Sequence, residues 1–450
     1  MEENKMGSMK INKLIMTMSL PIIISMLVQA LYNIVDSMFV ARVSENALTA
    51  VSLCYPIQMI LVAVACGTGV GINALLSRNL GLKKQKDANQ VALHGLMLSL
   101  LNGAVFAILG LLFSKQFLSL FTDNPEILEM GISYMQICMV FSVGVFVQIT
   151  YERIMQSTGN TVYNMIIQGV GALTNIILDP IFIFGYFGVP AMGVAGAAIA
   201  TVIGQMVAMI LGIVITKYKI KLVQLHLKDF KLSTTLLKSI YRIAIPAILM
   251  QSIMSFMTVF MNMILVQFST LAVSVFSIYY KLQQFVFMAV SGITNAIIPI
   301  ISFNFGAKHK QRILDAIYFS LKLASIIMIL GTIVFQLFPE QLLYLFDAKA
   351  DMLAIGIPAL RTISLSFVFA GISMILCSAF QALDHGQNSL IITLLRQMIL
   401  LVPCTYVFAQ LFGLNLSWWS FVITEALCCL LSLGYLHTIK AKTILTIKEA

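Results

Sequence analysis

Three acidic residues lie inside long apolar segments of the sequence: Asp36, Asp179 and Glu425. An ionisable group at the centre of a membrane costs about 2.5–3.5 kcal/mol on insertion scales, so residues of this kind are functional candidates. Each aspartate follows a polar residue by four positions, Tyr32 and Asn175 respectively. Residues four apart share one face of a helix, so each segment would present a polar stripe.

Two carboxylates that lie close together in a low-dielectric interior cannot both be ionised cheaply. Such a pair can take up a proton, or it can bind Na⁺ at Asp36, Asn175 and Asp179 with further oxygens from Tyr32 and the backbone. We therefore interpret Asp36 and Asp179 as a candidate coupling-cation site. The alternative is that both side chains extend to the outer surface of the membrane.

The other charged residues inside apolar segments have less defined roles. Glu425 either lines a substrate cleft or stabilises a polar contact between helices, and Lys281 either lines the cleft or neutralises Glu425. Arg361 and Arg396 have no partner that the sequence identifies. The seven cysteines show no metal-ligand spacing, and no phosphate loop, nucleotide fingerprint or nucleophile elbow occurs. The sequence therefore predicts no enzyme, and no cofactor other than a transported H⁺ or Na⁺.

The elements that carry these residues are membrane helices. Of 450 residues, 60% are hydrophobic and 10% are charged, and the mean hydropathy is +0.96. Soluble domains carry about 25% charged residues. Because lipid cannot satisfy backbone N–H and C=O groups, continuous apolar runs of this length must be helices. Twelve spans are predicted, near 14–41, 47–76, 88–113, 127–151, 161–185, 192–216, 239–267, 271–301, 313–338, 352–380, 388–412 and 417–439.

The distribution of the positive residues behind the formal net charge of +10 indicates how the chain is oriented in the membrane. If the N-terminus is cytoplasmic, nearly all the Lys and Arg residues of the loops are cytoplasmic, and the opposite loops hold Arg42, Lys115 and Lys349. This asymmetry predicts a multi-pass protein of the bacterial inner (plasma) membrane with both termini in the cytoplasm. The positive charge faces membrane lipids, and nucleic acid is not required as a partner.

A shift of the sequence by 225 residues, half its length, aligns polar, Gly and Pro positions. Pro21 falls on Pro246, and Gln156 falls on Gln381. The chain is thus predicted to hold a six-helix N-terminal lobe (1–216), a basic cytoplasmic linker (217–238) and a six-helix C-terminal lobe (239–450). Six is an even number, so both lobes run in the same direction across the membrane and form parallel, pseudo-symmetric bundles. A cleft between two such lobes is the design of an alternating-access transporter.

The repeat is broken where the acids lie, because the positions that correspond to Asp36 and Asp179 hold Met261 and Cys404. Several local elements also resemble the multidrug and toxic compound extrusion (MATE) family, in its prokaryotic DinF/MepA-like branch. The resemblance covers nearly the whole chain. It rests on the Ser-Leu-Pro element at 19–21 with Asp36 fifteen residues later, Gly81 with its following lysines, the Asn-x-x-x-Asp-Pro element at 175–180, the small-residue run at 193–201 and the Ala-Ile-Pro element at 244–246.

The resemblance implies cation-coupled export of amphipathic, often cationic, drugs. It places the coupling site in the N-terminal lobe and carries the family's roles onto Tyr32, Asp36, Asn175, Asp179 and Thr201. It also implies that Pro21 permits the first span to bend, because proline removes a helix hydrogen bond. The seventh span departs from other branches, since it offers Gln251 and no acid. Flexible sulfur side chains suit a promiscuous pocket, and the cleft candidates are Gln251, Met155, Met206, Met250, Met254 and Met288.

The prediction is therefore an all-α, twelve-span antiporter, monomeric, that exchanges H⁺ or Na⁺ for small amphipathic compounds. A lipid-linked oligosaccharide flippase of the same superfamily is one alternative, and its cleft would need more Arg and Lys than Lys281, Arg361 and Arg396 supply. An integral-membrane enzyme would require clustered His, Glu or Asp near a membrane face, which the sequence does not show. A receptor or scaffold is disfavoured by the repeat and by the intramembrane acids.

Overall fold

A computed structural model describes residues 4–346 and 348–448 of the chain. In these residues the structure consists of α-helices with short 3-10 and π-helical turns, and it contains no β-strand. Ten helical segments are long and apolar enough to cross a membrane, and two bent helix pairs bring the number to twelve. The predicted all-α membrane fold is confirmed.

The chain divides into two compact units. The first is built mainly from Leu20–Ile245, and the second from Met6–Ser19 together with the chain from Pro246 onward. The division falls inside α2 (Ile11–Ala41) and α9 (Thr234–Leu265), next to the proline of each helix. A proline has no N–H to give, so the helix is weakest there. The observed division thus lies beyond the predicted linker 217–238, and it assigns residues 6–19 to the second unit.

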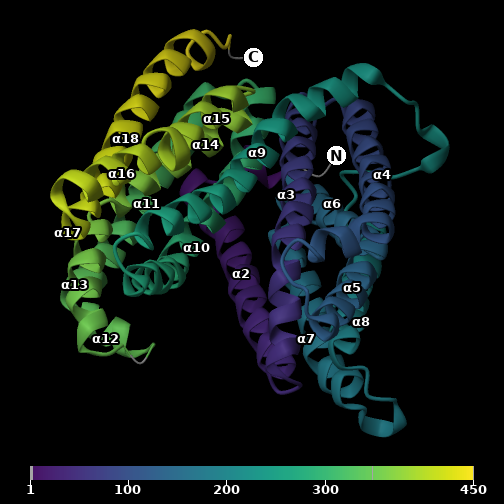
Figure 1. Cartoon of the computed structure of the whole chain (residues 1–450). Helices are drawn as coiled ribbons and strands as arrows, with labels where there is room; N and C mark the ends of the chain where they lie inside the picture. The colour runs from purple at the N-terminus through teal and green to yellow at the C-terminus, as the bar shows by residue number, and fades with distance from the viewer. Residues whose placement is uncertain (1–3, 347, 449–450) are drawn as a thin grey trace. The chain divides into compact units, whose positions relative to one another are not determined.

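The first unit is a bundle of long helices that follow one another in the chain (Figure 1). Besides the greater part of α2, its helices are α3 (Glu45–Gly81), α4 (Gln85–Leu118), α5 (Pro125–Val140), α6 (Val143–Ser157), α7 (Thr161–Phe184) and α8 (Gly193–Lys219), with 3-10 turns η1 (Tyr186–Gly188) and η2 (Leu227–Asp229). The core side chains include Val40, Phe106, Phe146, Ile183 and Ala197. Val40 and Ile183 bring the ends of α2 and α7 into this core, and these are the helices that carry the two aspartates.

The segment between α8 and α9 lies along the start of α4. Asn89 Oδ1 accepts a hydrogen bond from the Gln224 N–H (3.0 Å), and His94 Nε2 accepts one from the Ser233 N–H (3.0 Å). Gln85 and Gln90, on the same helix, make three further polar contacts with backbone groups of the basic linker. Hydrogen bonds to the linker backbone therefore fix the linker on the first unit.

The second unit has the same order of elements. Its helices are α10 (Thr270–Gly306), α11 (Lys310–Leu337), α12 (Pro339–Tyr344), α13 (Ala350–Ser364), α14 (Phe367–Ala382), α15 (Gly386–Leu394), α16 (Leu401–Phe412), α17 (Leu414–Ser417) and α18 (Trp419–Ile439), with π-helical turns η3 (Leu395–Ile399) and η4 (Lys440–Ile444). The short helix α1 (Lys5–Ser8) precedes α2. Arg312 Nη2 holds the chain there by donating to the carbonyls of Met6 (2.9 Å) and Met9 (2.8 Å).

The sequence repeat reappears as repeated structure. The pair α5–α6 is bent by 44° and the corresponding pair α13–α14 by 47°. The Ser77 hydroxyl donates to the Ser157 carbonyl, and the Ser302 hydroxyl donates to the Ala382 carbonyl at the same spacing. Lys83 and Lys308 lie just after the ends of equivalent helices, both in the left-handed conformation, with φ of 58° and 62°. The two halves therefore share backbone geometry, and their functional differences must come from side chains.

Candidate functional site

The polar stripe of α7 is held against α8. Asn175 Nδ2 donates to Asp179 Oδ1 (3.3 Å) on its own helix and to Thr201 Oγ1 (3.2 Å) on α8. This reach depends on close packing of the two helices, because a Cβ atom on Gly204 would lie 2.8 Å from the Gly171 carbonyl oxygen. Asp179 is fully buried and Asn175 is 2% exposed. The asparagine therefore fixes one oxygen of the carboxyl group and ties it to the neighbouring helix.

The second acid comes from α2. Asp36 is buried, and its carboxyl group lies close enough to that of Asp179 for the two to interact directly. Tyr32, one turn earlier, lies close enough to interact electrostatically with both carboxyl groups. The edge-to-face contact of Phe39 with Phe184 (6.3 Å between centroids) holds the ends of the two helices together. The first unit thus brings Tyr32, Asp36, Asn175, Asp179 and Thr201 into one cluster, which we call the acid cluster.

Two neighbouring carboxylates in a low-dielectric interior repel each other, and a proton on one of them relieves that repulsion. Among the described residues, neither aspartate forms an ion pair with a basic side chain. Three oxygens of the acid cluster, Asp36 Oδ1, Asp179 Oδ2 and Asn175 Oδ1, are buried without a hydrogen-bond partner. Burying an unpaired polar oxygen is costly. The acid cluster is therefore built to accept something else: a proton, a cation or water.

A second layer of polar groups lies behind the acid cluster, and sequence reasoning missed it. Gln58 Nε2 on α3 donates to the Tyr134 hydroxyl (3.2 Å) and to Cys138 Sγ (3.9 Å), both on α5. Tyr134 and Cys138 each interact electrostatically with Asp36. The available signal was Gln58 itself, a polar residue in the middle of a predicted span.

Sequence reasoning also missed a fourth intramembrane acid, Glu152 on α6, which is 4% exposed. Gln148 Nε2 donates to one carboxyl oxygen and Gln168 Nε2 to the other, each at 3.0 Å. Asn164 Nδ2 donates to the Glu152 carbonyl (3.2 Å). The residue was overlooked because the predicted span ended at position 151, one residue too early.

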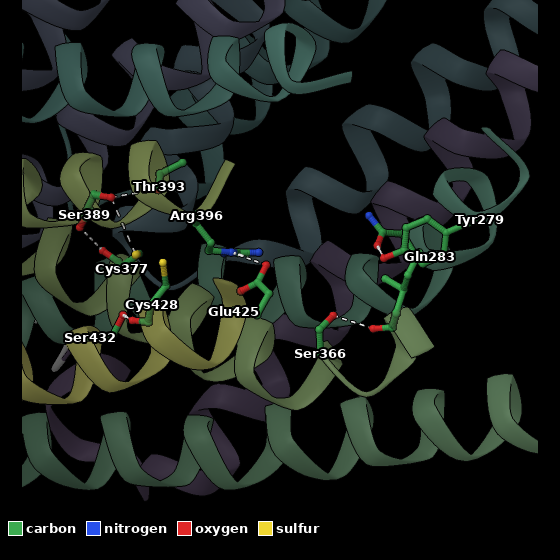
Figure 2. A network of polar contacts seen from close by, with 11 residues as sticks. Tyr279, Gln283, Ser366, Cys377, Ser389, Thr393, Arg396, Glu425, Cys428 and Ser432 are labelled. Carbon is green, nitrogen blue, oxygen red and sulfur yellow. Dashed lines mark hydrogen bonds and ion pairs between the residues drawn. The ribbon is translucent and has the colours of Figure 1, made fainter. Parts of the chain in front are cut away.

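In the second unit, the ion pair of Glu425 is with Arg396, not with Lys281. Arg396 Nε donates to Glu425 Oε1 at 2.7 Å (Figure 2). Lys281 is exposed, and its Nζ atom lies 5.9 Å from the centre of the Phe346 ring. Arg361 is also exposed. The partner of Glu425 could not be identified from sequence because it comes from another helix, 29 residues away.

Of the remaining cleft candidates of the first unit, Met155 is a core residue and Met206 is half-buried. Met155 is fully buried, and the Met206 sulfur packs against Gly144, 3.2 Å from the place where a Cβ would lie. Pro21 lies inside α2, which is one continuous helix, and its carbonyl accepts a hydrogen bond from the Ser25 hydroxyl (2.8 Å). The counterpart of α2 in the second half of the chain is α9, at the seventh predicted span.

The cleft candidates of the second unit differ in exposure. Gln251 is exposed and Met254 is 43% exposed, whereas Met288 is 6% exposed. Met250 Sδ accepts a weak hydrogen bond from Gln381 Nε2 (3.7 Å). Gln381 corresponds to Gln156 in the repeat, but Gln156 instead accepts a hydrogen bond from Asn73 Nδ2 (3.3 Å).

The comparisons with known proteins agree with this geometry. The sequence matches the MatE family over residues 21–181 and 246–407. It is 26% identical over 438 residues to the multidrug export protein MepA of Staphylococcus aureus strain MSSA476, covering 97% of this chain and 96% of the relative. It is 27% identical over 441 residues to MepA of Staphylococcus haemolyticus, covering 97% and 95%.

Solved structures are similar over the same length. A multidrug resistance MATE family transporter in an outward-facing conformation has a TM-score of 0.91 and 27% identity, with 98% of each chain covered. A MATE protein in the bent conformation has a TM-score of 0.92 and 28% identity, covering 99% of this chain and 100% of that one. Both halves of the chain match, and the proteins concerned are transporters rather than enzymes. The chain therefore belongs to the multidrug and toxic compound extrusion (MATE) family of membrane transporters.

Proposed function

We propose that this chain is a proton-coupled multidrug antiporter that exports amphipathic, often cationic, compounds by alternating access. The names of its relatives support multidrug export. The observation that carries the coupling is the acid cluster: two adjacent, buried carboxyl groups with no basic partner in the described residues. The proposal includes a cell-membrane location with both termini in the cytoplasm, supported by the distribution of Lys and Arg.

The charge of the acid cluster explains the exchange. With one shared proton, Asp36 and Asp179 together carry a single negative charge. A cationic drug can neutralise that charge, and so can a second proton, but both together would leave a buried positive charge. Each ligand therefore weakens the binding of the other, which is the thermodynamic requirement for exchange. Proton uptake from the outer side would release the drug and favour return to the inward-facing state.

A proton fits the acid cluster better than Na⁺ does. A single proton relieves the repulsion between the two adjacent carboxyl groups, and Asn175 presents its Nδ2 atom, a donor, to Asp179 and Thr201. A sodium ion would need oxygens directed at one point. In this arrangement the amide of Asn175 turns its donor toward the acid and leaves its own oxygen unpartnered.

The test is efflux of the cationic dye ethidium from proteoliposomes that contain the purified protein. An outside-acid pH gradient should drive efflux by the wild type, and Asp36→Asn and Asp179→Asn should each reduce it to the level of empty liposomes. Asp123→Asn makes the same chemical change in an exposed loop and should leave efflux unchanged. Gradient-driven efflux by both cluster variants would refute the proposal.

A second arm separates the two cations. The same proteoliposomes receive an inward Na⁺ gradient at equal pH on both sides. Proton coupling predicts no gradient-driven efflux in this arm. Efflux that depends on Na⁺ and is lost in Asp36→Asn would assign the acid cluster to Na⁺ instead.

A further inference from the structure

A second buried charged site lies in the C-terminal unit and has no role in the coupling proposed above. Arg396 and Glu425 are each 9% exposed and form an ion pair in which a single nitrogen, Nε, meets a single oxygen, Oε1 (2.7 Å). Figure 2 shows the two side chains pointing toward each other from separate helical segments. A salt bridge with one contact on each side leaves most of the binding capacity of both groups unused.

An irregular turn positions the arginine. Arg396 lies in η3, where the Leu400 N–H donates to the Leu395 carbonyl five residues earlier (2.9 Å). Pro403 follows and has no N–H to offer the preceding turn, which favours an irregularity in this segment. Turns of the π type inside helices are frequent at functional sites. The local sequence thus supplies an irregularity that turns Arg396 toward α18.

Hydrogen-bond acceptors and hydrogen-bond donors are both left without partners at this ion pair. Glu425 Oε2 and Gln397 Oε1 are buried without a hydrogen-bond partner. The two terminal nitrogens of Arg396 have no partner in the part of the chain that the structure describes. Those two nitrogens form the end of the guanidinium that holds a carboxylate with two parallel hydrogen bonds. Arg396 therefore offers a free face to an anion while Glu425 occupies its Nε side.

The surroundings define the rest of the ligand. Tyr279 of α10 interacts electrostatically with both charged groups, and its ring packs on Phe421, one turn before Glu425 (6.1 Å between centroids). The titratable groups that face the ion pair are Tyr279, Cys377, Cys428 and Cys429. None of them is a second cation. The site therefore suits one carboxylate on an apolar body.

The depth of Arg396 in the membrane argues against a lipid headgroup as its ligand. Arg396 is the eleventh residue of the 27-residue span Gly386–Phe412, about 15 Å from its start at a rise of 1.5 Å per residue. Lipid phosphates lie outside the hydrocarbon layer, which is about 30 Å thick. An anion that reaches Arg396 must therefore enter the middle of the membrane, as a lipophilic weak acid can.

We propose that Arg396 binds the carboxylate of a lipophilic weak acid, with Glu425 taking a proton as the ligand enters. The charge balance requires both events. Arg396 and Glu425 sum to zero, and a bound carboxylate would leave one buried negative charge unless Glu425 becomes neutral. Arg396 repels a cationic drug, so this site adds an anionic substrate class to the proposed export function and rests on that function for its role in transport.

The experiment measures binding to purified protein in phosphatidylcholine nanodiscs, without any gradient. The probe is pyrene-1-carboxylate, and its uncharged control is pyrene-1-carboxamide. Trp418 and Trp419, the two tryptophans of the chain, lie about 10 Å along α18 from Glu425 and serve as donors for energy transfer to pyrene. The wild type should bind the carboxylate at least tenfold more tightly than the carboxamide at pH 6, and this preference should shrink at pH 8, where proton uptake by Glu425 is harder.

Three variants distinguish a carboxylate-binding site from an ion pair that has only a structural role. Glu425→Gln should bind the carboxylate at least as tightly as the wild type, with no pH dependence, since the neutral site no longer needs the proton. Arg396→Gln should lose the preference. The double variant Arg396→Gln/Glu425→Gln, which carries no buried charge, should also show none. Even if Arg396→Gln alone fails to fold, Glu425→Gln and the double variant differ only at Arg396 and keep the test decisive.

Two results would overturn the proposal. Equal weakening of carboxylate binding by Glu425→Gln and Arg396→Gln would show that the ion pair is structural. Displacement of the probe by phosphatidylglycerol in the nanodiscs would assign Arg396 to a lipid headgroup. The variant Asp36→Asn/Asp179→Asn should keep the carboxylate preference, so failure of the coupling proposal and failure of this one give different results.

Discussion

The two units share a backbone plan but bury their charges differently. The N-terminal unit holds two carboxyl groups, Asp36 and Asp179, that meet each other and no basic side chain of the described residues. The C-terminal unit holds one carboxyl group, Glu425, paired with Arg396 at 2.7 Å. Two acids have a variable charge, because protons are the means by which they relieve their repulsion. An acid paired with an arginine has its charge balanced without a proton, because the guanidinium favours the carboxylate as long as the ion pair is intact.

This difference matches the two roles proposed for the units. The proposed coupling site needs groups that can gain and lose a proton, and the adjacent acids of the N-terminal unit are groups of this kind. The C-terminal unit has Met261 and Cys404 at the corresponding positions, so the duplicated backbone carries no second acid pair. Its buried charges are instead on α18 and on the irregular turn η3.

The largest effect is expected when the acids of the N-terminal unit are given a basic partner, as Glu425 has in the C-terminal unit. Thr201→Lys would place an ammonium next to Asn175 and Asp179 and hold the carboxylates ionised. We expect pH-driven ethidium efflux from proteoliposomes to fall to background. Thr201→Met has similar length without charge and should retain measurable efflux. Full proton-driven transport by Thr201→Lys would show that a variable charge is not needed.

The next effect is on stability. Arg396→Gln should lower the free energy of unfolding by about 3–5 kcal/mol, because it leaves Glu425 buried without its counterion. Asp36→Asn should change it by less than about 1 kcal/mol, because no ion pair is lost. Unfolding in mixed micelles with increasing dodecyl sulfate measures both. Equal losses in the two variants would remove the distinction between the units.

A smaller effect is expected at Asn175, whose amide binds both Asp179 and Thr201. Asn175→Leu removes a hydrogen bond to a charged group, which contributes about 1.5–3 kcal/mol. We expect proton-driven efflux to fall at least tenfold, since about 1.4 kcal/mol corresponds to a factor of ten. Asn33→Leu, on the exposed side of α2, is the matched control. Unchanged efflux in Asn175→Leu would mean that the acid cluster functions without its amide.

The smallest effects test single neutral hydrogen bonds in each unit. Thr201→Val should reduce proton-driven efflux only a few-fold, because a neutral hydrogen bond contributes about 0.5–1.5 kcal/mol. Tyr279→Phe removes the hydroxyl that donates to Gln283 in the C-terminal unit and should leave ethidium efflux unchanged. A strong loss of ethidium efflux in Tyr279→Phe would place cationic drugs in the C-terminal unit.

The sequence predicted the elements well because membrane helices are strongly constrained. The bent pair α5–α6 was expected as one span and appears as two helices with a 44° bend. The same constraint explains the miss at Glu152, since hydropathy locates the end of a span only to within a few residues. A buried acid at that end resembles a loop residue in sequence, and only its amide partners Gln148 and Gln168 show that it is inside.

The pairing of side chains was much harder to predict. The stripe of Asn175 and Asp179 follows from helix geometry alone, since both residues lie on one turn. The ion pair of Glu425 with Arg396 joins residues 29 positions apart on different elements. From the sequence, only Lys281 was considered as a partner for Glu425. The polar groups behind Asp36, which are Gln58 and Tyr134, belong to helices whose facing sides the apolar pattern does not reveal.

By itself, the sequence determined that this protein is a duplicated bundle of membrane helices whose first half carries an acid pair absent from the second. Those features depend on the solvent, because lipid forces every span to be helical and makes each buried charge conspicuous. Only the tertiary structure decided which buried charge meets which. Contacts between helices depend on how their faces pack, and in an almost uniformly apolar chain neighbouring faces have nearly the same composition. The close approach of α7 to α8 and the irregular turn that carries Arg396 are therefore properties of the folded chain.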